Sequence, residues 1–202
     1  INDEDSDKRD EWEEDEAVDL SEDVKDATSK VMDINPIPIS ISAVDASSVH
    51  LGETNRGVIS AIRVAIWKQE PRDKPRLYVY GPYMVHITPD NAGFIYNYFR
   101  QEVFGLKEYQ KPPKIQKLTD RIRNFFERLG QRHASKIIRD GITLWDGSLT
   151  GGTVDTPLEL LKESVELAHQ NNNSVIGISK RSVLKTSSGE KILDLLEGER
   201  RV

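Results

Sequence analysis

Two aspartates, Asp45 and Asp146, occur in the same local setting. Each ends a row of apolar residues, "IPISISAVD" and "ITLWD", and each is followed by small residues, "ASS" and "GS". A carboxylate on the core-facing side of a strand end is costly unless a charge or a metal ion compensates it. Carboxylate oxygens suit Mg²⁺ or Mn²⁺. The pair therefore predicts a divalent cation shared by two neighbouring strands.

Other interpretations of these residues are simpler. Either aspartate taken alone is a turn-capping residue at the end of a strand. The chain has no cysteine, which excludes disulfides and thiolate metal sites. The histidines lack the spacing of metal ligands and are expected to be structural or exposed: His50, His86, His133 and His169. A shared site thus depends on the two aspartates being brought together.

The apolar patterns predict the element order β-β-β-α-α-β-α-β. Strands are expected where apolar residues alternate or form short runs, and helices where they recur every three to four residues. The expected strands cover residues 35–51, 57–69, 77–88, 141–149 and 174–180, and the expected helices residues 89–105, 111–138 and 156–170, with a short last helix in residues 187–202. Hairpin-linked strands followed by crossover units imply an α/β fold, a mixed five-stranded sheet with flanking helices.

Four motifs in this order resemble the NurA family of DNA-repair nucleases. They are "AVDASS", "RNFFE" on the long expected helix, "LWDGSL" and "VIGISK". The resemblance covers Ile37 to Ser182, and it implies a ribonuclease H-like core, with which the expected element order agrees. It also implies that Asp45, Glu127 and Asp146 are the catalytic acids and the metal ligands.

The resemblance further implies three substrate-binding residues. These are Arg123, which precedes the helix acid, Ser148 of the D-G-S motif, and Lys180, which closes "GISK". A lysine there would hold a DNA phosphate as a point charge, whereas its ordinary interpretation is a solvated strand end. Ala46 replaces the glycine that the family usually has after its first acid.

Glu127 has two interpretations from the residues alone. It lies opposite the apolar stripe of its helix, which predicts a solvent-exposed glutamate. Small and apolar residues follow on its own face, however: Gly130, Ala134, Ile137 and Ile138. That face is expected to pack on the sheet with Glu127 at its rim, and Glu102 is the alternative third ligand.

The activity that the resemblance implies is hydrolysis of DNA with two Mn²⁺ or Mg²⁺ ions. It implies 5′-to-3′ exonuclease and single-strand endonuclease activity in DNA end resection and double-strand-break repair. The expected partners are DNA, a HerA-type translocase and a second copy of the chain in a homodimer. We expect a cytoplasmic protein without a membrane span, because no apolar run approaches the ~18 residues that a span needs.

Two other functions remain open. Family members continue into a C-terminal part with further site residues, so residues 33–202 are expected to form a C-terminally incomplete nuclease domain. This makes a catalytically inactive, partner-binding scaffold plausible. An actin-like or sugar-kinase-type phosphotransferase would share the core, but it needs a glycine-rich phosphate loop after the first strand, and "DASSVHLGETNRG" is poor in glycine.

Acidic residues are concentrated at the start of the chain. Residues 1–26 hold fourteen Asp/Glu against three Lys/Arg, so 20 acids and 25 bases remain in the rest of the sequence. A segment with so many like charges buries too little apolar surface to fold alone. We therefore expect residues 1–32 to form an acidic, flexible segment, followed by a mildly basic body that suits a polyanionic partner.

Deletion of residues 1–26 should leave the body folded and should not weaken DNA binding. The segment repels a polyanion, so its removal is expected to tighten binding at low salt. Thermal melting and a DNA-binding titration of the truncated chain test this. A lower Tm or a weaker affinity would place the segment in the core or in the binding site.

Overall fold

The structure is a computed structural model that describes residues 17–18, 37–147, 149, 157–178, 185–186 and 189. The chain divides into two units. Residues 37–178 form one, and residues 1–36 and 179–202 form the other. In the second unit, β1 (Ala17–Val18) and β7 (Lys185–Thr186) pair in parallel.

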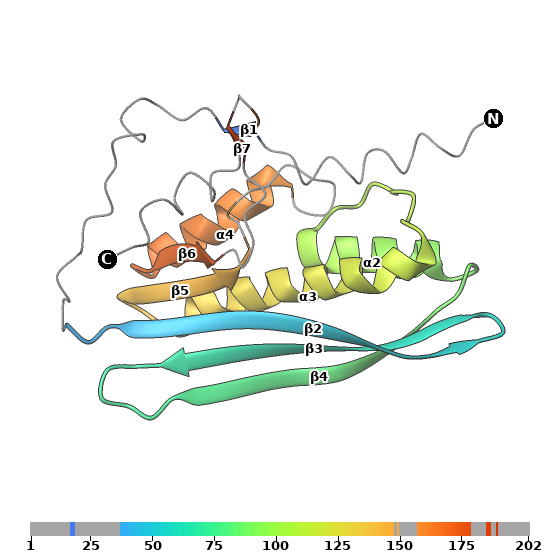
Figure 1. Cartoon of the computed structure of the whole chain (residues 1–202). Helices are drawn as coiled ribbons and strands as arrows, with labels where there is room; N and C mark the ends of the chain where they lie inside the picture. Colours follow the sequence, from blue (N-terminus) through green and yellow to red (C-terminus); the bar gives the residue numbers. More distant parts are fainter. Residues whose placement is uncertain are drawn as a thin grey trace. The chain divides into compact units, whose positions relative to one another are not determined.

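The unit of residues 37–178 is an α/β fold with a five-stranded mixed sheet. Its strands are β2 (Ser40–Thr54), β3 (Gly57–Gln69), β4 (Arg76–Ile87), β5 (Gly141–Asp146) and β6 (Ser174–Ile178). The first three form an antiparallel meander, and β5 and β6 add in parallel on the other side of β2. The spatial order is β4-β3-β2-β5-β6 (Figure 1), which confirms the predicted mixed sheet.

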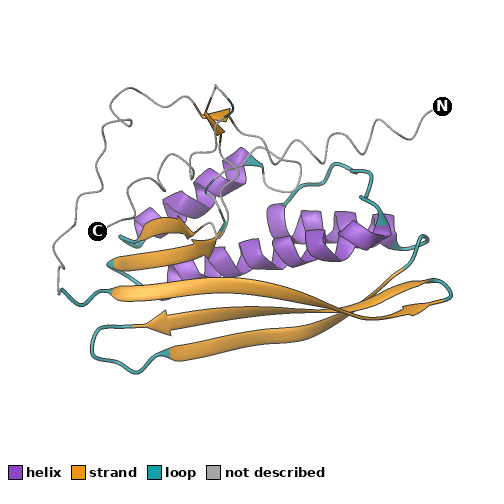
Figure 2. Cartoon of the chain, in the orientation of Figure 1, coloured by secondary structure: helices purple, strands orange, loops and turns teal. Residues whose placement is uncertain are grey.

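Three helices accompany this sheet, α2 (Ala92–Phe104), α3 (Ile115–Ile137) and α4 (Leu158–Gln170). They all lie on the same side of it (Figure 2). The short helix expected in residues 187–202 lies outside the described residues. Within the described part of the chain, no helix is long and apolar enough to cross a membrane.

Helix α3 lies directly on the central strands. Its first half packs Leu118, Ile122 and Phe125 into a core cluster that includes Ile62 of β3. Its second half approaches the sheet at Gly130, where a Cβ atom would lie 2.9 Å from a methyl group of both Val44 and Val64. Only a residue without a side chain allows this approach.

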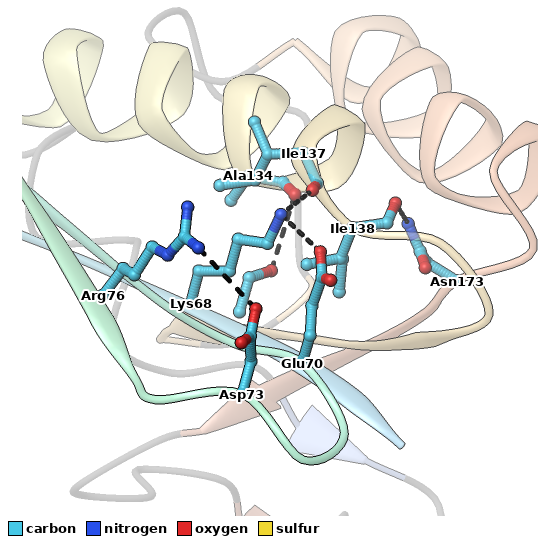
Figure 3. A network of polar contacts seen from close by, with 9 residues as sticks. Lys68, Glu70, Asp73, Arg76, Ala134, Ile137, Ile138 and Asn173 are labelled. Atoms are coloured by element: carbon cyan, nitrogen blue, oxygen red, sulfur yellow. Dashed lines mark hydrogen bonds and ion pairs between the residues drawn. The ribbon is translucent and has the colours of Figure 1, made fainter.

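Polar contacts hold the C-terminal end of α3 (Figure 3). The last carbonyl groups of a helix have no partner within the helix. Lys68 of β3 donates from Nζ to the Ile137 carbonyl at 2.7 Å and also pairs with Glu70. Asn173, which is buried, donates from Nδ2 to the carbonyls of Ser135 and Ile138 at 3.1 and 2.9 Å. These bonds fix where α3 ends on the sheet.

The substitution Gly130→Val should lower the free energy of unfolding by about 1–3 kcal/mol, because the added side chain overpacks the contact with Val44 and Val64. The matched control is Gly52→Val in β2, since a Cβ at Gly52 meets no atom within 4 Å. Urea denaturation of both variants measures the difference. Equal stabilities would show that α3 does not depend on this close approach.

Candidate acidic site at the end of β5

Asp45 and Asp146 lie on adjacent parallel strands, as predicted. Val44 of β2 is opposite Trp145 of β5, and both side chains are buried on the side of the helices. Each aspartate is the next residue on its strand. Because successive side chains alternate between faces, both carboxylates belong to the other face of the sheet. We call this face, which no described helix covers, the open face.

The predicted orientation of the alternating row before Asp45 was wrong. The row that contacts the helices is Ser40, Ser42 and Val44, whereas Asp45 is exposed. Small hydroxyl side chains fit under α3 because they find partners there. Ser42 lies 3.2 Å from the Thr143 hydroxyl of β5, and both residues are fully buried. Asp45 is therefore not a buried charge, and burial alone does not require a cation there.

The two aspartates also differ in their place along the strand. Asp146 is the last residue of β5, but Asp45 lies inside β2, which continues to Thr54. Gly147 follows Asp146 with φ +88°, a conformation that favours glycine. Its N–H donates to the Ile178 carbonyl at 2.9 Å. The chain therefore turns immediately after Asp146, at the point where the pairing of β2 with β5 ends and β2 continues beside β3.

Glu127 lies at the same level of the sheet. Helix α3 runs antiparallel to β2, since Gly130 packs on Val44 and Asp120 accepts a hydrogen bond from the Ser48 hydroxyl at 3.3 Å. Glu127 falls between these two contacts. It therefore approaches β2 from the helix side, level with the two aspartates and with the end of β5.

The electrostatic environment of Glu127 agrees with this placement. Its pKa is raised, first by burial and then by the charges of Asp146 and Asp45, while the charge of Arg128 lowers it. Gln131, which is buried, donates from Nε2 to Glu127 Oε1 at 3.3 Å and accepts a bond from Arg128 at 2.8 Å. The charges of the two aspartates thus act on Glu127 from across the end of β5.

The fit of these residues to a metal ion is partial. Among the described residues, no three His, Cys, Asp or Glu side chains gather closely enough to hold an ion. Asp45 and Asp146 occupy the open face, whereas Glu127 comes from the helix side. The donor chemistry, three carboxylates and no soft ligand, suits Mg²⁺ or Mn²⁺. The three carboxylates therefore suit such an ion in their chemical type and in their position along the strands, but they lie on two sides of the sheet.

Of the other predicted site residues, Arg123 lies close enough to Glu127 for its charge to lower the pKa of that carboxyl, against the raising effect of burial. Arg123 lies on α3, 3.8 Å from Asp120 in an ion pair. Glu102, the alternative ligand, is exposed on α2. Ser148 and Lys180 lie outside the described residues.

Arg63 is a candidate residue that the sequence analysis missed. It lies on β3, opposite Ser47 of β2, and it is exposed on the same face as Asp45. Its signal in the sequence is a single charge inside the apolar run "GVISAIRVAIW". The pairing of β2 with β3 was needed to place it near an acid.

Glu127→Gln should stabilise the chain at neutral pH. The pKa of Glu127 is higher in the folded state than its unfolded value of 4.5. Between these two pKa values the folded state binds more protons than the unfolded state, so the free energy of unfolding falls as the pH rises through this range. A glutamine at this position has no charge to lose or gain, so the variant does not lose stability in this pH range. Melting curves should show a higher Tm for the variant at pH 7 and no difference well below pH 4.5. Glu102→Gln is the exposed control, and a pH-independent difference would contradict this origin.

Comparison with protein-family models, curated proteins and solved structures finds no match to this chain. The NurA resemblance therefore depends on the four quoted motifs and on the arrangement of the acids. It stays a prediction.

Proposed function

We propose that the chain is a metal-dependent DNA nuclease with a ribonuclease H-like core, similar to the NurA family. The observation that supports this most is the placement of three acids from distant parts of the sequence. Asp45 and Asp146 lie side by side on parallel strands, and Glu127 lies level with them on α3. Burial raises the pKa of Glu127, and the charges of Asp146 and Asp45 raise it further.

The topology supports the same proposal. If the five strands β2 to β6 are counted 1 to 5 along the chain, their order across the sheet is 3-2-1-4-5. The first three form an antiparallel meander, and the last two are parallel to the first. The first and fourth strands are thereby neighbours, and these strands provide the two aspartates. In α/β sheets with such a change of direction, sites form at the carboxyl ends of the strands. Asp146 is at that end of β5.

In the proposed mechanism, Asp45, Asp146 and Glu127 would hold two Mn²⁺ or Mg²⁺ ions. When bound, the ions supply an activated water and stabilise the leaving 3′ oxygen of a phosphodiester. Gln131 holds the Glu127 carboxylate through its 3.3 Å hydrogen bond. The position of Asp45 on the open face leaves the substrate side free of the described helices.

The proposed substrate contacts and partners extend this function. Arg123, Ser148 and Lys180 are proposed to contact DNA, as the resemblance implies. A HerA-type translocase and a second copy of the chain are the proposed partners. The proposed role is the 5′-to-3′ resection of broken DNA ends, together with single-strand cleavage.

A catalytically inactive scaffold is the second candidate. The observation that favours it is that the acids among the described residues do not form a compact metal-binding group. A phosphotransferase has less support, because the hairpin between β2 and β3 closes through the two-residue turn Asn55–Arg56. Such a turn is too short to surround nucleotide phosphates.

Asp45→Asn and Asp146→Asn should each reduce Mn²⁺-dependent DNA cleavage by several orders of magnitude with an unchanged Tm. The metal supplies both the nucleophile and the charge stabilisation, so the loss of one ligand affects both. The control is Asp140→Asn at the opposite end of β5, where the side chain accepts a bond from Asn172. Cleavage of labelled single-stranded DNA measures the effect.

Two results would contradict this proposal. Near-native cleavage by either variant would show that the substituted aspartate is not a metal ligand of the active site. A native chain that cleaves no DNA with Mn²⁺ or Mg²⁺ would favour the scaffold.

A further inference from the structure

One arginine on the open face has no partner among the described residues. Arg63 of β3 is exposed and forms no hydrogen bond or ion pair within the described part of the chain. Other cations near the sheet are engaged: Lys68 pairs with Glu70, and Arg76 lies 3.7 Å from Asp73. Among the described residues, no group thus competes with an anion for the donors of the Arg63 guanidinium.

The ladder between β2 and β3 places this arginine beside the acidic site. Asp45 is opposite Ala65, and Ser47 is opposite Arg63, so all four residues share the open face. A diagonal neighbour on a sheet lies roughly 7 Å away, within reach of a long side chain. The Arg63 guanidinium can therefore extend over the sheet next to Asp45.

The ladder between β3 and β4 is irregular at Arg63. Ile62 pairs with Tyr83 and Val64 with Tyr80, so Gly81 and Pro82 together oppose Arg63. Bulges of this kind redirect side chains and occur next to functional sites. The neighbours of Arg63 across both ladders are thus small, a serine on one side and Gly81–Pro82 on the other.

Exposed apolar residues occupy this face on the two strands that flank Arg63. They are Val49 of β2 and Leu77, Val79 and Met84 of β4. A guanidinium presents paired N–H donors that match the oxygens of a phosphate.

We propose that Arg63, assisted by the Ser47 hydroxyl, binds a backbone phosphate of single-stranded DNA beside the phosphodiester at Asp45 and Asp146. The identity of the substrate rests on the proposed function. The contact positions the strand on the open face and does not read its sequence, because phosphates carry no sequence information.

The test is a binding titration of a labelled single-stranded oligonucleotide in EDTA, where no metal-dependent cleavage occurs. Arg63→Met is expected to weaken binding about fivefold to tenfold for every sequence. It should also reduce the slope of log K against log salt by about 0.7, the value for one phosphate contact on a single strand. Arg63→Lys keeps the charge and should recover part of the affinity.

The control is Arg76→Met, which removes an exposed arginine of β4 that is paired with Asp73. Both variants should keep the native Tm, since exposed side chains are changed. Equal binding by Arg63→Met and the native chain overturns the inference. A native chain that binds no DNA overturns both the inference and the proposed function. A third result is that Arg63→Met binds DNA more weakly while the native chain shows no Mn²⁺-dependent cleavage. This result supports the phosphate contact at Arg63 and refutes the proposed nuclease activity.

Discussion

The position of α3 on the sheet is the constraint on which the candidate site depends. Gly130 lets the helix touch β2 and β3 directly, and Lys68 and Asn173 hold its C-terminal carbonyls. Together these contacts determine how far along β2 each helical residue lies. Glu127 reaches the level of the two aspartates because α3 is held in this way. A shift of one helical turn would move it about 5.4 Å along the sheet.

Glu127 lies on the other side of the sheet from the two aspartates, and their charges still act on it. Asp45 and Asp146 belong to the open face, while Glu127 belongs to the helix side and is half-buried. The end of β5 makes this possible: β5 stops at Asp146, whereas β2 continues to Thr54 and beyond that level is paired, among the described strands, with β3. The raised pKa of Glu127 is the consequence of burial and of two nearby negative charges.

The sequence predicted the elements well and their orientation poorly. Alternation identified β2, and glycine at 105 marked the end of α2. A period of two does not tell which set of residues faces the helices, however. Hydrophobicity favoured the isoleucine row, yet Ser42 is buried because Thr143 and the Ala134 carbonyl lie within its hydrogen-bonding reach. Arg63 was missed for a related reason, since its neighbours belong to other strands.

The buried contact between Ser42 and Thr143 also bears on how faithfully the chain folds. A one-residue slip between β2 and β5 would reverse the face of every side chain on the slipped strand. It would bring Asp45 under α3 and expose Val44, and it would separate the two hydroxyl groups. A buried Asp45 and the separated hydroxyl groups would be uncompensated polar groups in the core, and an exposed Val44 would lose its apolar burial. Misregistered chains are therefore penalised by the same residues that form the candidate site, so that correct pairing and a complete site are selected together.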